Sequence, residues 1–292
     1  MASAKLLLAG ATLLLLLVST ALLGDAGGTP NPAGDSGSRP SHYSPPSSAG
    51  SRIPLQAPLV SQSRPAAIHD SRNWAGGVNA RPPIGTRFAA AKMNFTLPTT
   101  LGPDVLRPES TYYAGTAWVG IDGWHRAALL QVGVTFVMNK TESDEIKFLP
   151  FYEWTPAVAK FMDISMRPGD KIEVEAVMFN ATQGKVYLRN LSSGEWVARV
   201  LNAPQPDARL AGANVEWIVE DFRIVWEPDN VAFADFGVIE LKDCVAYTTD
   251  GEKVGPDQGE VFRIRQGNET RARATVNGTS VAVEYTRDAD LV

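Results

Sequence analysis

Two segments of the chain each place one polar side chain in an otherwise apolar, strand-like run. Gln131 lies in Ala128–Gly133, and Glu220 lies in Asn214–Phe222. A polar group in such a run must form hydrogen bonds, lie on an exposed sheet face or do chemistry. A glutamine amide can hold a water molecule and donate to an oxyanion, and a glutamate carboxylate can remove a proton. The two residues are therefore candidates for a catalytic pair.

The alternation of side chains along a strand predicts the surroundings of both residues. The face opposite Gln131 is apolar and is expected to face the core: Leu130, Val132, Val134 and Phe136. Gln131 shares its own face with Gly133, whose missing side chain leaves room for a ligand. Glu220 shares a face with Ile218 and Phe222, and this apolar setting is expected to raise its pKa. Both residues also have an ordinary interpretation as polar side chains on the wet face of a sheet.

A third candidate carboxylate lies in the aromatic segment Phe151–Trp154. The rings beside Glu153 can line a groove for peptide or sugar, or they can fill a core. With Glu220 it offers the two carboxylates of a glycosidase, an alternative that the sequence leaves open because it does not give their separation. Asp122 lies in Ile121–Gly123, where a turn is its usual role.

The composition excludes several other chemistries. Cys244 is the only cysteine, so neither an intrachain disulfide nor a cysteine-rich zinc site is possible. The histidines are His42, His69 and His125, and only His125 falls in the region expected to fold, which excludes a multi-histidine metal site there. No local signature of a Ser-His-Asp triad accompanies it. The formal net charge is −5 without a basic stripe, so we expect no nucleic-acid partner, and we expect no metal or cofactor.

The first 70 residues are not typical of a globular domain. Lys5 precedes an uncharged stretch that predicts a signal peptide at residues 1–24, and a signal anchor is the competing interpretation. Residues 25–70 are rich in Pro, Gly and Ser and are expected to be a propeptide or linker. Either interpretation sends the domain at residues 71–292 into the secretory pathway, and we expect a secreted protein. Six Asn-x-Ser/Thr sequons fit a secreted glycoprotein: Asn94, Asn139, Asn180, Asn190, Asn268 and Asn277.

From residue 71 onward the sequence is typical of short β-strands. Residues 171–176 and 280–285 alternate polar and apolar side chains. Leu191–Gly194 predicts one hairpin turn and Asn277-Gly278 predicts another. No long stretch keeps a helical period with caps at both ends. The pattern predicts an all-β antiparallel sandwich or barrel.

The two candidate segments resemble the active-site strands of the glutamic peptidases, the eqolisin family of secreted acid proteases. Four further segments resemble the same family in the same order: Asn73–Gly77, Tyr152–Pro156, Arg167–Ile172 and Val231–Phe236. The resemblance extends from about Ser71 to Tyr285. It implies a sandwich of two antiparallel sheets, similar to a concanavalin-like jelly roll, that is made with an N-terminal pro-segment.

The resemblance also implies roles for individual residues. Glu220 would activate a water as general base and return the proton to the leaving amine, and Gln131 would bind the water and stabilise the oxyanion. Positions in or near the family's cleft are matched by Trp118, Asp122, Glu153 and Trp154. The hypothesis is a secreted, monomeric acid endopeptidase that acts on polypeptides. The alternatives are a non-catalytic β-sandwich module that binds glycan or peptide, and the glycosidase with Glu153 and Glu220.

Two features depart from the family pattern. Cys244 matches a half-cystine position whose partner near the C-terminus is absent from this chain. The loop Trp124–Arg126 replaces a shorter, cysteine-containing turn, so the resemblance does not extend to substrate preference.

Overall fold

The computed structural model describes residues 17–18, 67–224 and 229–286. The predicted signal segment and the Pro-rich stretch after it lie outside the described residues, apart from Leu17–Val18 and residues 67–70. Within the described ranges, no helix has the length and apolar character needed to cross a membrane.

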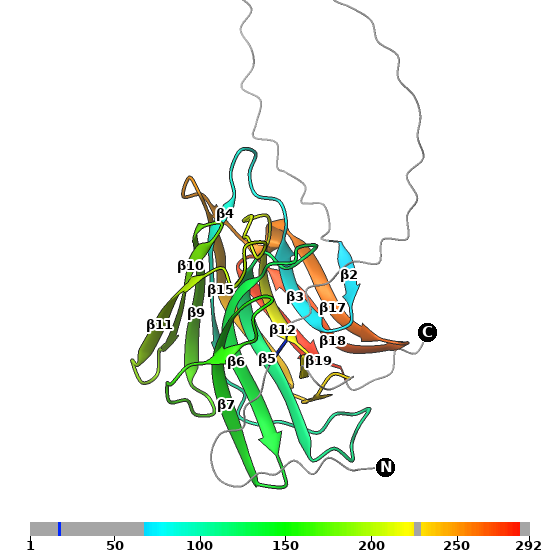
Figure 1. The fold of residues 1–292 in the computed structure, drawn as a ribbon. Coiled ribbons are helices and arrows are strands. Elements are labelled where there is room, and N and C mark those ends of the chain that lie inside the picture. The colour runs from blue at the N-terminus through cyan, green and yellow to red at the C-terminus, as the bar shows by residue number, and fades with distance from the viewer. Residues whose placement is uncertain (1–16, 19–66, 225–228, 287–292) are drawn as a thin grey trace, which may run out of the picture. The chain divides into compact units, whose positions relative to one another are not determined.

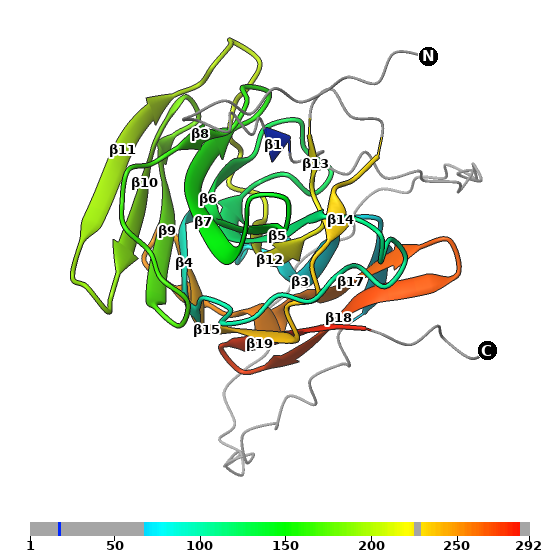
Figure 2. The same cartoon turned by 90° about the horizontal axis from the view of Figure 1, so that it is seen from below.

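The described residues form a sandwich of two mainly antiparallel sheets (Figures 1 and 2), which confirms the predicted fold class. The strands of the first sheet are, in spatial order, β7 (Ser143–Trp154), β6 (Leu130–Asn139), β5 (Tyr112–Ile121), β12 (Val215–Glu220), β3 (Trp74–Asn79), β17 (Glu260–Gln266), β18 (Glu269–Asn277) and β19 (Ser280–Tyr285). Those of the second sheet are β11 (Trp196–Asn202), β10 (Gln183–Asn190), β9 (Lys171–Asn180), β4 (Phe88–Thr96) and β15 (Val238–Thr248). Strand β15 joins the sheets, because its first part pairs with β19 and its last part with β4.

The remaining elements are short. They are β1 (Leu17–Val18), β2 (Ile68–Ser71), β8 (Lys160–Phe161), β13 (Arg223–Ile224), β14 (Ala232–Phe233), β16 (Lys253–Val254) and the 3₁₀-helix η1 (Pro256–Gln258). Two of them, β1 and β13, pair with each other as a separate two-stranded sheet. Strand β2 runs parallel to β17, so the folded domain includes His69 and begins a few residues before the predicted boundary at residue 71. The segment Ile-His-Asp-Ser has one apolar residue, too few for a strand signal.

Both predicted hairpins are confirmed. The turn at residues 191–194 joins β10 to β11, and Asn277-Gly278 joins β18 to β19. Gly278 has a φ of 56°, the left-handed conformation that this tight turn requires.

Side-chain alternation gives the first sheet two different faces. One face packs against the second sheet and contributes Leu130, Val132 and Val134 to the main core, as predicted. The opposite face of β7, β6, β5, β12, β3 and β17, hereafter the functional face, carries a second buried cluster that includes Trp118, Ile218 and Phe222. On β5, Thr116, Trp118 and Gly120 are every second residue, so they share the functional face. Gln131 pairs with Gly120 and Glu220 pairs with Thr116, so both belong to this face as well.

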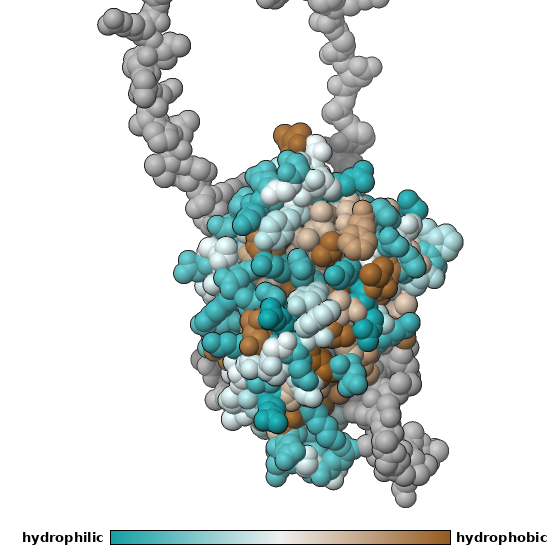
Figure 3. Space-filling view, turned by 90° about the vertical axis from the view of Figure 1, so that its left-hand side faces the viewer, coloured by the Kyte–Doolittle hydropathy of each residue, from teal (hydrophilic) through white to brown (hydrophobic). Residues whose placement is uncertain are grey.

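The side of the molecule formed by β9, β10 and β11 is mainly hydrophilic, with separated apolar side chains (Figure 3). Phe179, Trp196 and Val200 are exposed there.

The six sequons differ in accessibility, which gives a first prediction. Asn190 is 1% exposed, and its Nδ2 donates to Ser165 O at 3.1 Å and Asp170 Oδ2 at 2.8 Å. Asn180 and Asn277 lie exposed at hairpin turns. A glycan on Asn190 cannot be accommodated in this fold, because the amide nitrogen would lose both bonds and leave the interior. Glycopeptide mapping of the chain secreted from a eukaryotic host is expected to find glycans at Asn180 and Asn277 and none at Asn190. An occupied Asn190 in folded protein would contradict this assignment.

Candidate active site

Gln131 and Glu153 form a direct pair on the functional face. They are opposite each other in the β6–β7 register, and Gln131 Nε2 donates to Glu153 Oε2 at 2.5 Å. Gln131 is 1% exposed and Glu153 is 2% exposed, which rules out the interpretation of Gln131 as a surface residue on a wet sheet face. The hydrogen bond fixes which end of the amide faces β7.

Glu220 lies at the end of β12 and accepts two strong hydrogen bonds. Asn73 Nδ2 donates to its Oε1 at 2.8 Å, and Trp118 Nε1 donates to its Oε2 at 2.7 Å. The carboxylate is 1% exposed. Donors of this kind favour the ionised form of a carboxyl group, which opposes the effect of burial. Glu220 therefore has the surroundings of a buried base.

The indole of Trp118 is held in place by its neighbours. Gly133 lies directly opposite on β6, where a Cβ would come within 2.2 Å of Ala117 O and 2.5 Å of Trp118 Cβ. The ring of Trp74 packs edge-on at 5.1 Å. Gly133 thus allows close packing of Trp118, the donor to Glu220, whereas the sequence suggested room for a ligand.

Two expected cleft residues have other roles in the structure. Trp154 lies on the core face of β7, one residue from Glu153 and therefore pointing the other way, and its Nε1 donates to Ala208 O at 3.0 Å. The prediction that it contacts substrate is wrong for this reason. The carboxylate of Asp122 accepts three backbone N–H groups, from Ala211, Gly212 and Ala213, at 2.6–2.9 Å. It therefore anchors the loop before β12.

Sequence reasoning did not identify three polar residues of this region. Asn73 is separated from Glu220 by 147 residues, so its contact has no local signal. Glu216 and Asp221 flank Glu220 on and just after β12 and are fully buried. The signal that could have identified Glu216 and Asp221 is the presence of three carboxyl groups, with Glu220, within six residues of an apolar strand.

An aromatic cluster lies beside the functional face and includes the loop that departs from the family pattern. His69 stacks on Phe262 at 5.1 Å, and Trp124 packs edge-on against both rings at 5.4 and 5.3 Å. His69 and Arg81 both contact Glu260 at 2.5 Å. Burial acts in the opposite direction, but these two partners hold the pKa of Glu260 below its usual range.

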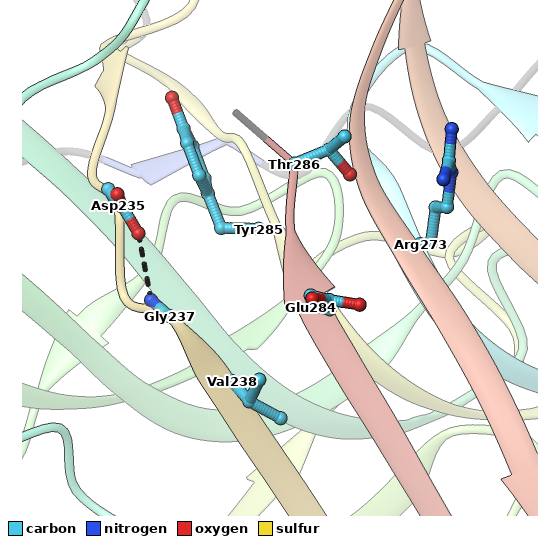
Figure 4. A pocket seen from close by; sticks show the side chains of 7 residues that line it. All are labelled: Asp235, Gly237, Val238, Arg273, Glu284, Tyr285 and Thr286. Atoms are coloured by element: carbon cyan, nitrogen blue, oxygen red, sulfur yellow. Dashed lines mark hydrogen bonds between the residues drawn. The ribbon is translucent and has the colours of Figure 1, made fainter. Parts of the chain in front are cut away.

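A pocket of about 380 Å³ lies away from these residues, between β15, β18 and β19 (Figure 4). Its lining is mixed in charge: Asp235, Gly237, Val238, Arg273, Glu284, Tyr285 and Thr286. None of the candidate catalytic residues lines it. Across the described residues, no group of three or more His, Cys, Asp or Glu side chains is placed to hold a metal ion.

The functional face thus carries a buried carboxylate with two donors, Glu220, and a buried amide, Gln131. The chain belongs to the peptidase A4 family, whose model matches residues 72–285, and it is a glutamic-type peptidase.

Its relatives agree with this assignment. The chain is 33% identical over 231 residues to aspergillopepsin-2 of Aspergillus niger, covering 74% of this chain and 78% of the relative. It is 30% identical over 220 residues to scytalidopepsin B of Scytalidium lignicola, covering 73% and 77%. Similar solved structures are scytalido-glutamic peptidase with a transition state analog inhibitor (TM-score 0.62, 29% identity, 74% of this chain and 98% of that one) and aspergilloglutamic peptidase from A. niger (0.54, 35%, 60% and 99%). These findings confirm the predicted family and fold.

Asp221 gives the structure a defined dependence of stability on pH. Burial raises its pKa from 3.8 to about 7, against the hydrogen bond from Gln266. A carboxyl group whose pKa is raised by folding stabilises the fold while it is neutral, and this contribution is lost as pH rises from about 4 to 7. The loss amounts to about 4 kcal/mol.

The free energy of unfolding, measured by denaturant titration, is therefore expected to fall between pH 4 and pH 7.5. Asp221→Asn should flatten this dependence, because the amide does not ionise. An equally steep dependence in Asp221→Asn and in the parent chain would contradict the assignment.

Proposed function

We propose that this peptidase is a secreted acid endopeptidase that cleaves polypeptides with Glu220 as general base and Gln131 as oxyanion donor. The observation that carries the proposal is the pair of hydrogen bonds from Asn73 and Trp118 to Glu220, which favours a charged carboxylate on a buried face. Secretion is supported by the apolar stretch near the N-terminus and by the exposed sequons.

The proposed reaction uses one water molecule. Glu220 takes a proton from the water as its oxygen attacks the peptide carbonyl carbon, and the carbonyl electron pair moves onto oxygen. Gln131 donates to this oxyanion with the Nε2–H that is not committed to Glu153. The C–N bond then breaks as Glu220 returns its proton to the leaving nitrogen.

The structure favours Glu153 as a positioning residue for Gln131. Its Oε2 holds the amide at 2.5 Å, and its strand lies one position further from β12 than the strand of Gln131. A two-carboxylate glycosidase with Glu153 and Glu220 receives no support from this arrangement.

The first experiment is digestion of a denatured protein at acidic pH in the presence of pepstatin, which inhibits aspartic peptidases. Cleavage that persists supports the proposal, and absence of cleavage rejects it.

Substitutions of the pair test the mechanism. Glu220→Gln keeps the volume and removes the base, and Gln131→Ala removes the oxyanion donor. Each is expected to lower kcat about a hundred- to thousand-fold or more. The double variant should be little worse than the worse single variant, because both groups act in the same step, the attack of water on the carbonyl carbon.

The matched control is Glu195→Gln, an exposed glutamate on the β10–β11 turn, which should keep the wild-type rate. Glu153→Gln should lose less than Gln131→Ala. If Gln131→Ala keeps most activity and Glu153→Gln abolishes it, the two-carboxylate mechanism replaces this one.

The processing site is constrained by β2. We expect maturation to remove the Pro-rich segment by a cut ahead of Ile68, a few residues before the Ser71 position that composition alone suggested, because β2 pairs with β17 and His69 bonds Glu260. N-terminal sequencing of active enzyme decides this. A mature start upstream of about residue 50 would make the segment a retained stalk.

A further inference from the structure

Three buried oxygens on the functional face have no hydrogen-bond partner among the described residues. They are Gln131 Oε1 and both carboxyl oxygens of Glu216. Gln131 is 1% exposed and Glu216 is 0% exposed. Buried polar atoms without partners are costly and rare, so this group requires an explanation. Two further unpartnered atoms of this face, Trp74 Nε1 and Thr135 Oγ1, belong to the row of residues that contains Glu220.

The strand register places Gln131 and Glu216 in one row across the sheet. Gly120 on β5 pairs with Gln131 on one side and with Glu216 on the other. Their Cα atoms are therefore separated by two strand spacings, about 10 Å, and the residue between them in the row, Gly120, has no side chain of its own. A Cβ built on Gly120 would lie 3.3 Å from Glu216 Oε2, 2.8 Å from Leu129 Cδ1 and 2.9 Å from Trp118 Cζ3, so the carboxyl group of Glu216 reaches the space over Gly120, beside these two side chains.

The surroundings of Glu216 favour its neutral form. Burial raises the pKa of Glu216 well above the usual range, and the nearby charge of Asp122 adds to this effect. The backbone amide of Trp124, which donates to Asn214 Oδ1, has a smaller effect that lowers the pKa. The other ionisable groups of the row are Glu153 beyond Gln131, and Glu260 beyond Val78, the latter with His69 and Arg81 as its partners. Gln131 Oε1 and an ionised Glu216 carboxylate can only accept hydrogen bonds. A neutral Glu216 carboxyl group has one O–H, and it can donate this proton to Gln131 Oε1.

We propose that Glu216, as a neutral carboxylic acid, is a positioning residue for Gln131 that donates across Gly120 to the amide Oε1. The amide is then held at both ends, by Glu216 at Oε1 and by Glu153 at Nε2. Donation to the amide oxygen also polarises the group and strengthens Nε2–H as a donor to the oxyanion, as in other hydrogen-bond chains. This inference rests on the role proposed above for Gln131.

The test compares two variants of nearly equal size. Glu216→Leu removes the donor and is expected to lower kcat about tenfold with little change in KM, as for loss of one neutral hydrogen bond. Glu216→Gln keeps a donor that does not ionise, so it should retain kcat within about threefold at acidic pH. Its activity should also persist to higher pH than that of the wild type, with the folded fraction followed by circular dichroism in the same samples.

Gly120→Ala provides a second test that keeps the side chains of both Glu216 and Gln131, and the double variant Gly120→Ala/Glu216→Leu separates its effect on the pair from its contact with Trp118. The added methyl group would lie 3.3 Å from Glu216 Oε2, 2.8 Å from Leu129 Cδ1 and 2.9 Å from Cζ3 of the Trp118 indole, and kcat should fall. The proposal is overturned if folded Glu216→Leu matches the wild type. It is also overturned if Glu216→Gln loses as much as Glu216→Leu with an unchanged pH profile. If Glu216→Leu does not fold, wild-type kcat in folded Gly120→Ala overturns it. Wild-type rates in Glu220→Gln would instead reject the proposed function, which separates the two failures.

Discussion

The hydrogen bonds that Asn73 and Trp118 donate to Glu220 stabilise a charged carboxylate inside an apolar sheet face, and the rest of the site depends on these two bonds. Three carboxyl groups lie on or next to β12, all buried. Glu220 has two side-chain donors within 2.8 Å, whereas Glu216 has none among the described residues and Asp221 has one. Burial acts on all three in the same direction, so the number of donors decides which carboxyl group is best suited to the role of base that we propose for Glu220.

The supporting parts of the fold serve the placement of those donors. Trp118 can reach Glu220 because Gly133 leaves no side chain opposite it. Asn73 is placed by β3 and by the bond that the Asp221 backbone N–H donates to its carbonyl oxygen at 2.9 Å. The segment after Glu220 therefore helps to hold the partner of Glu220. Asp221 also titrates beside this contact, which links the dependence of stability on pH to the position of Asn73 and so to the surroundings of Glu220.

Local patterns predicted much of this and failed where contacts are distant. Period-two alternation isolated Gln131 and Glu220 and assigned their core neighbours correctly, since it depends only on strand geometry. The same rule, applied to Trp154, would have placed it on the opposite face from Glu153, but the resemblance grouped these neighbours together. Asn73 could not be found, because no local signal marks a contact across 147 residues. Strand β2 was missed because an edge strand with one apolar residue depends on its partner β17.

The aromatic cluster of His69, Trp124 and Phe262 ties a loop to the functional face. Trp124 lies in the loop that departs from the family pattern and contacts His69 and Phe262. Phe262 lies in the row of Trp118, across Ile218 and Gly76, so the cluster continues the functional face beyond β12 and β3. The same loop region is tied to β12 through Asn214, which bonds Trp124 at both its amide and its carbonyl group. A substitution in this loop therefore affects both the aromatic cluster and β12, the strand that carries Glu216 and Glu220.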